Sequence, residues 1–121
     1  MTDPRPITDA QRIPPQDVAD CAAKGLELRA RHRRGGTEVG HARALQLKNR
    51  QPVTDRDIKS IYSYFARHEV DKRSMYWGMA DKPSAGYIAW LLWGGEPGKA
   101  WIGALRDALH DAPRDKPRAA A

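Results

Sequence analysis

The sequence has one cysteine, one phenylalanine and no long hydrophobic run. Cys21 cannot form an intramolecular disulfide, which favours a reducing, cytosolic setting. The longest apolar run, YIAWLLW, covers only residues 87–93, whereas a membrane-spanning helix needs about twenty apolar residues. Residues 1–15 contain four prolines and lack the apolar core of a signal peptide. We therefore expect no membrane partner.

Motifs of known catalytic and cofactor-binding sites are also missing. The chain contains no G-x-S-x-G, Walker A or G-x-G-x-x-G pattern. His32, His41, His68 and His110 are scattered, and neighbouring residues of RHEVDK would point about 100° apart on a helix. We therefore predict no catalytic residue, no bound metal and no cofactor, and we do not expect an enzyme.

Positive charge is concentrated in one quarter of the chain. Residues 24–50 contain eight lysines and arginines but only two acidic residues, so this segment alone accounts for the net charge of +6. Such a concentration is typical of a surface that binds a polyanion, although a solvated surface that keeps the protein soluble is an equally good interpretation from charge alone.

The apolar spacing predicts an all-α fold. We expect a flexible arm over residues 1–15, a helical domain over 16–111 and a disordered tail over 112–121. The domain is a compact bundle of about five short helices. They are expected at 16–34, 38–49, from Thr54 to about residue 68, from Ser84 to Gly94, and from Pro97 onward.

Two of these helices carry clear local signals. Thr54 followed by Asp57 forms a capping pattern, and Ile58, Ile61, Tyr62 and Phe65 then predict the buried face of that helix. In the helix at 38–49, Thr37 is the expected cap, and the inward residues are expected to be Val39, Ala42 and Leu45.

Three of the four tryptophans lie in SAGYIAWLLWGGEPGKAWIGAL, residues 84–105. Around a helix, Ile88, Leu91 and Leu92 would face one way, and Trp90 and Trp93 the other. A helix that is apolar all round is either central in the core or covered by a partner. We favour a core position over a base-stacking or ligand-binding role. In the last helix, Trp101, Ala104, Leu105 and Ala108 are expected to face inward.

Arginine and lysine side chains are the candidate ligands for phosphate. Arginine forks match phosphate oxygens, and charge at this density favours binding through counterion release. The main candidates are Arg29, Arg31, Arg33, Arg34, Arg43, Lys48 and Arg50, followed by Arg56, Lys59 and Arg67. We expect non-specific attraction to nucleic acid, with DNA preferred over RNA. A helix-turn-helix over residues 37–68 is a less favoured interpretation, because the turn NRQPV is long.

An aromatic loop, SMYWGMADKP, offers a different kind of contact. Tyr76, Trp77 and Met79 are candidates for a protein interface, since aromatic residues and methionine are common interface anchors. The same residues are equally suited to fold back onto the core.

Much of the chain resembles a domain of tailed-phage gene products. The similar words are GGTEVGHARALQL, SYFARHEVDK and SAGYIAWLLWGG, within residues 20–102. That domain occurs alone or beside head-morphogenesis modules such as prohead proteases, and its function is unknown. The resemblance implies phage origin and a role around the head or its DNA, in the host cytoplasm or in the virion. It supplies no catalytic residues. With a phage origin, the alternatives to nucleic-acid binding are a virion assembly protein that docks on capsid or another head protein, and a small host-takeover inhibitor. His41 and the short loop RSMYWGMADK depart from the usual pattern.

Overall fold

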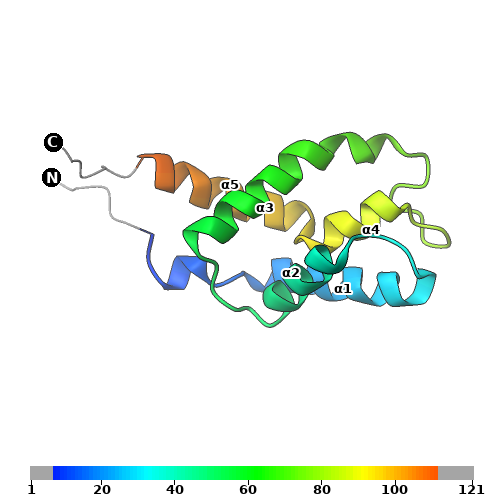
Figure 1. Ribbon diagram of the computed structural model, residues 1–121, viewed down its shortest axis with the longest axis horizontal. Helices are drawn as coiled ribbons and strands as arrows, with labels where there is room; N and C mark the ends of the chain where they lie inside the picture. The colour runs from blue at the N-terminus through cyan, green and yellow to red at the C-terminus, as the bar shows by residue number, and fades with distance from the viewer. Residues whose placement is uncertain (1–6, 112–121) are drawn as a thin grey trace, which may run out of the picture.

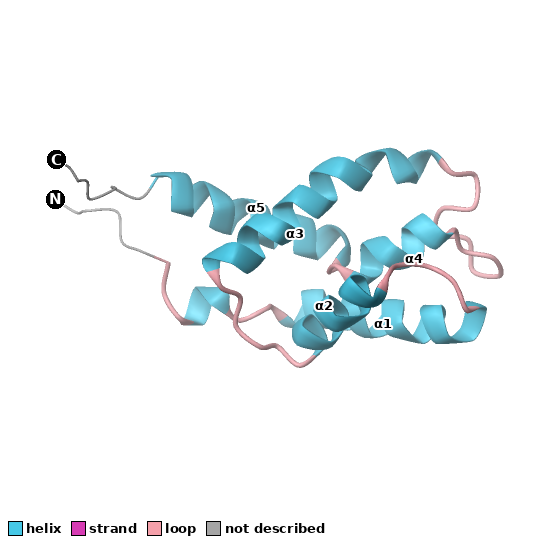
Figure 2. Ribbon diagram, viewed as in Figure 1, coloured by secondary structure: helices cyan, strands magenta, loops and turns pink. Residues whose placement is uncertain are grey.

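The computed structural model describes residues 7–111, which form a bundle of helices (Figure 1). In chain order the elements are η1 (Ala10–Arg12), α1 (Gln16–His32), α2 (Glu38–Lys48), α3 (Asp55–His68), η2 (Glu69–Arg73), α4 (Ala85–Leu92) and α5 (Gly95–Asp111). No strand occurs within this described range (Figure 2). The predicted all-α fold with five helices is confirmed. Residues 1–6 and the predicted tail at 112–121 lie outside the described residues.

The helices form two packed groups that meet at α4. Helix α1 packs mainly against α2 and α4, and α3 packs mainly against α5. In Figure 1, α3 and α5 run along one side, α1 and α2 lie on the other, and α4 sits between them. Because α4 contacts each of the other four α-helices, its sequence must be apolar on every side.

Helix α4 explains the tryptophan-rich segment. Ser84 caps it by accepting a hydrogen bond from the backbone N–H of Tyr87, as predicted. Ile88 and Leu92 are fully buried, and Trp90 is only 1% exposed. Gly94 follows in a left-handed conformation (φ 118°), which lets the chain turn directly into α5. The prediction of a central, buried helix is confirmed.

An aromatic cluster joins α4 to α3. The Tyr64 ring stacks on Trp93 with ring centroids 4.6 Å apart, and Phe65 meets Trp90 edge-on at 4.7 Å. Trp101 of α5 is half-buried, and its indole N–H donates to the Gln11 carbonyl at 3.2 Å. The tryptophans of this segment therefore belong to the core or pack against it.

Helix α3 has the predicted start and nearly the predicted face. The Thr54 hydroxyl accepts from the Asp57 backbone N–H, and the Asp57 carboxylate accepts from the Thr54 backbone N–H, which completes a capping box. Ile58, Ile61 and Phe65 are buried as expected. Tyr64 is buried in the place expected for Tyr62, which is only half-buried.

The inward faces predicted for α2 and α5 need correction. In α2, Val39 is 65% exposed and Leu45 is 41% exposed, while the buried residues are Gly40, Ala44 and Leu47. Glycine and alanine on the inner face let α2 approach α4 closely: a Cβ on Gly40 would lie 3.3 Å from Trp93 Nε1. In α5, Ala104 is exposed.

Ile102 takes the inward position of α5 that was expected for Ala104. It is fully buried, and Leu105 beside it is buried as predicted. Two positions apart on a helix, Ile102 and Ala104 lie on nearly opposite faces, and the face with the larger apolar residue is buried, as the hydrophobic effect favours.

Residues 7–15 belong to the predicted flexible arm, yet they pack against the domain. Ile7 and Pro14 are buried. The Arg12 guanidinium donates to the Val53 carbonyl at 3.1 Å and pairs with Asp55 at 2.7 Å. These long-range contacts place this segment against the start of α3.

Candidate nucleic-acid interface

The turn between α1 and α2 is held by two glycines and one arginine. Helix α1 ends at His32, and the cap residue Arg33 donates its backbone N–H to Arg29 O at 2.8 Å. Gly35 follows with a φ of 95°, and a Cβ there would lie 2.6 Å from Ile88, so only glycine fits so close to α4. The Arg29 Nε–H donates to the Gly35 carbonyl at 2.9 Å. Arg29 therefore has a structural role in closing this turn.

An open pocket of about 410 Å³ lies beside this turn. We call it the arginine pocket, and its walls are Leu26, Arg29, Ala30, Arg33, Arg34, Gly35, Gly36 and His41. Arg33 and Arg34 are exposed, and neither forms an ion pair with any described residue. Two unpaired guanidinium groups at a concave surface suit a phosphate ligand.

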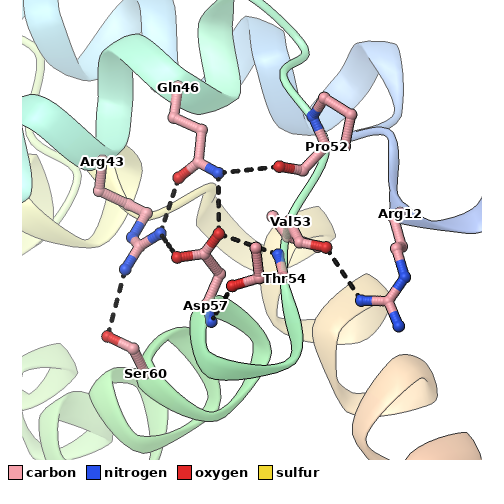
Figure 3. A network of polar contacts seen from close by, with 8 residues as sticks. All are labelled: Arg12, Arg43, Gln46, Pro52, Val53, Thr54, Asp57 and Ser60. Atoms are coloured by element: carbon pink, nitrogen blue, oxygen red, sulfur yellow. Dashed lines mark hydrogen bonds and ion pairs between the residues drawn. The ribbon is translucent and has the colours of Figure 1, made fainter. Parts of the chain in front are cut away.

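Arg43 is not available to a phosphate, contrary to the prediction. Its side chain is only 13% exposed and points toward α3 (Figure 3). The guanidinium donates to Asp57 at 2.8 Å, to Gln46 at 2.7 Å and to Ser60 at 3.3 Å. It also lies 5.3 Å from the Trp93 ring centroid. Because α2 turns Ala44 and Leu47 inward, Arg43 comes to the α2–α3 seam.

The same network changes the titration of Asp57. Burial alone would raise the pKa of this carboxyl group. Hydrogen bonds from the Thr54 backbone and from the Arg43 and Gln46 side chains outweigh burial and lower the pKa to about 2. Asp57 is therefore ionised at neutral pH and holds Arg43 in place.

Three more of the predicted phosphate ligands differ in whether another residue of the chain already contacts their charged group. Arg31 pairs with Glu27 one turn earlier in α1, at 2.6 Å. The Arg50 Nε–H donates to the Pro14 carbonyl at 2.8 Å, which ties the N-terminal segment to the end of α2. Lys48 is exposed and has no ion pair among the residues described. Of these three residues, only Lys48 forms neither an ion pair nor a side-chain hydrogen bond with another described residue.

The cations of α3 are the most regularly placed. Arg56, Lys59, Ser63 and Arg67 are all exposed, and their spacing puts them in one row along the helix. We call this row the α3 ridge; it extends over about 16 Å at the standard rise per residue. None of its three cations has an acidic partner within residues 7–111. The candidates ranked second by sequence are thus freer than most of the first.

A second pocket borders the α3 ridge, and the sequence-based site did not include it. Its volume is about 380 Å³, and it is lined by Lys59, Tyr62, Ser63, Arg106, Leu109 and His110. The Arg106 guanidinium carbon lies 4.3 Å from the Tyr62 ring centroid. The outward position of Arg106 on α5 was visible in the sequence, but its contact with Tyr62 depends on how α3 and α5 pack.

The aromatic loop is divided between core and surface. Trp77 is half-buried, and its ring meets Tyr87 edge-on at 5.1 Å and Trp90 at 5.6 Å. Tyr76 and Met79 are exposed, as is Met75. Trp77 thus folds back onto the core, whereas Tyr76 and Met79 remain accessible to a partner.

Glu69 is the first residue of η2, directly after α3. It pairs with two lysines, Lys99 of α5 at 2.9 Å and Lys72 at 2.9 Å. These hydrogen bonds lower the pKa of Glu69. Among residues 7–111, no group of three His, Cys, Asp or Glu side chains is placed to hold a metal ion.

Comparison with protein-family models, curated proteins and solved structures finds no match for this chain. The phage origin implied by the sequence resemblance therefore stays a prediction. Within the described residues, no helix is both long and apolar enough to cross a membrane.

Proposed function

We propose that this chain is a non-enzymatic phage protein that binds nucleic acid through the phosphate backbone. The observation that carries the proposal is the α3 ridge, where Arg56, Lys59 and Arg67 stand in one exposed row without acidic partners among the described residues. A row of unpaired cations on a rigid helix attracts a polyanion at no cost of breaking existing ion pairs.

The arginine pocket supplies a second set of contacts. Arg33 and Arg34 are exposed and unpaired within the described range, and the volume of about 410 Å³ leaves room for phosphate oxygens between them. Together with Lys48 and the α3 ridge, they make six free cations. Arg43 is excluded from this set because Asp57 and Ser60 occupy its guanidinium.

Three variants test the proposal. The first is the triple variant Arg56→Ala, Lys59→Ala and Arg67→Ala. The second is Arg33→Ala with Arg34→Ala. A control, Arg73→Ala with Lys82→Ala, removes two exposed cations from the segment after α3. The affinity of each is measured for a labelled DNA strand and for DNA and RNA duplexes at several salt concentrations.

We expect the triple variant to bind more weakly and to reduce the slope of log K against log salt by about 2, since each lost phosphate contact contributes about 0.7 on a single strand. The second variant should reduce the slope by about 1. The control should retain both the affinity and the slope of the unmodified chain. A loss in the control as large as that in the second variant, which removes the same number of charges, would mean that only net charge matters and would contradict the proposal. Unchanged affinity in both test variants would also contradict it.

A second candidate function is virion assembly through protein contacts. The observation in its favour is the exposed apolar group on the loop after η2, where Met75 is 79% exposed beside Tyr76 and Met79. Purified capsid protein would then co-elute with the chain in the absence of nucleic acid. Substitution of Tyr76 and Met79 should abolish that co-elution, whereas substitution of the α3 ridge should not.

A further inference from the structure

The pocket between α3 and α5 combines a flat cationic surface with apolar walls. Arg106 lies over the Tyr62 ring, with 4.3 Å between the guanidinium carbon and the ring centroid. This distance is that of a cation–π contact, which holds the guanidinium over the aromatic face. Leu109 adds an apolar wall, and Lys59, Ser63 and His110 place hydrogen-bonding groups around the rim.

This pocket is continuous with the α3 ridge. Lys59 and Ser63 belong to both, so the ridge forms one wall of the pocket. A phosphate held by Lys59 would therefore bring the base of the same nucleotide beside the pocket. Nucleobases stack on guanidinium planes and on aromatic rings, and their edges accept and donate hydrogen bonds.

We propose that the α3–α5 pocket binds an unstacked nucleobase, so that the partner is a single-stranded nucleic acid. This inference rests on the proposed function, because the ridge must first hold the backbone. The pocket volume of about 380 Å³ lies at the lower end of the range for small-ligand sites, which suits a base better than a large ligand. In a duplex the bases are stacked and paired, and a base must be flipped out at a cost before it can enter.

The charge around the pocket agrees with this ligand. Lys59 of α3 and Arg106 of α5 both line the pocket, and the only acidic oxygen within 4.0 Å of either charged group in the described residues is Asp107 Oδ1, which lies 4.0 Å from Arg106 Nη1. A nucleotide brings both a negative phosphate for the rim and a planar, polarisable base for the Arg106–Tyr62 surface. An acidic peptide would use the charge but not the flat surface.

The test compares three labelled DNA probes with the full chain. They are an oligothymidylate of about 12 nucleotides, an abasic strand of the same length, and a duplex of the same length. The variants are Arg106→Lys, which keeps the charge but removes the planar guanidinium, and Tyr62→Leu, which keeps apolar volume but removes the ring. The control is Arg73→Lys, the same chemical change at an exposed site on η2.

We expect the unmodified chain to bind oligothymidylate about 10-fold more tightly than the abasic strand, as one stacked base contributes. Arg106→Lys and Tyr62→Leu should each remove most of that difference while leaving affinity for the abasic strand unchanged. Arg73→Lys should keep it. Circular dichroism of both pocket variants checks that they are folded, and Arg106→Lys changes no residue of the core.

The outcomes separate this inference from the function on which it rests. Salt-dependent binding that is equal for the abasic strand and oligothymidylate, or a base-dependent gain that survives both pocket variants, overturns the base site alone. Tighter binding to the duplex than to the single strand also overturns it. Failure to bind any of the three probes overturns the proposed function together with the base site.

Discussion

The Arg43 guanidinium donates a 2.8 Å hydrogen bond to the Asp57 carboxylate across the seam between α2 and α3. Asp57 is also part of the capping box of α3, because its carboxylate accepts from the Thr54 backbone N–H. Arg43, which belongs to the basic segment of residues 24–50, therefore links α2 to α3 (Figure 3). The distinction between structural and free cations follows from such contacts and determines where a polyanion can bind.

Loss of the Arg43 side chain should destabilise the fold. Arg43→Ala leaves the largely buried Asp57 carboxylate without its cation, and we expect the free energy of unfolding to fall by about 2 to 4 kcal/mol. Urea unfolding measures the change. Arg56→Ala, an exposed control on α3, should change it by less than about 0.5 kcal/mol. Equal stability of the two variants would contradict a structural role for Arg43.

Stability should decrease in acid through Asp57. Its pKa in the folded chain is about 2, below the ordinary value of 3.8, so its contribution is present above pH 4 and is lost as the pH falls toward 2. The contribution is about 2 kcal/mol. Urea unfolding of Asp57→Asn at pH 6 and pH 2 should show a smaller pH dependence than the unmodified chain. Asp81→Asn, at an exposed loop carboxylate, should leave that dependence unchanged.

The crossing of α1 and α4 should not tolerate a side chain at Gly25. A Cβ at this position would lie 2.8 Å from the Leu92 backbone nitrogen, so the helices must move apart. We expect Gly25→Ala to cost about 1 to 3 kcal/mol of unfolding free energy. Gly103→Ala on α5 is the matched control, with no atom within 4 Å, and should stabilise the helix by about 0.5 to 1 kcal/mol. A stabilising effect of both changes would refute this close packing.

Because Trp77 packs on the core and Met75 is exposed, substitutions at these two nearby residues should differ in their effect on stability. Trp77 packs on Trp90 and Tyr87, so Trp77→Ala should lower the melting temperature and cost about 2 kcal/mol. Met75 is 79% exposed, and Met75→Ala should leave stability within about 0.5 kcal/mol. Thermal unfolding checks both. Unchanged stability of Trp77→Ala would mean that this ring is not part of the core.

Sequence patterns predicted the fold best where periodicity and caps agreed. Thr54 and Asp57 marked the start of α3, and Ile58, Ile61 and Phe65 marked its buried face. Helix α2 was different because apolar residues occur all around it. Gly40, on the buried face of α2 with Ala44, lies close to Trp93, which is far along the chain, so local spacing could not show that this face is buried rather than the face of Val39.

The candidate site was predicted in composition but not in detail. Arg33 and Arg43 are equivalent as sequence letters, and only the position of Asp57 shows that Arg43 is structural. The contact between Arg106 and Tyr62 depends on the packing of α5 against α3, which helical periodicity does not reveal. The density of positive charge in the sequence thus predicted the kind of partner. Which cations are free of structural contacts can be seen only in the tertiary structure.

The proposed function requires that the free cations bind the phosphate backbone of nucleic acid. Its most direct test is the affinity of the full chain for a labelled single strand at salt concentrations between about 50 and 200 mM. If all six of these cations contact phosphate, the slope of log K against log salt is about −4 on a single strand, and we expect a value between about −2 and −4. Absence of binding at the lowest salt, or an affinity that does not change with salt, would contradict the claim.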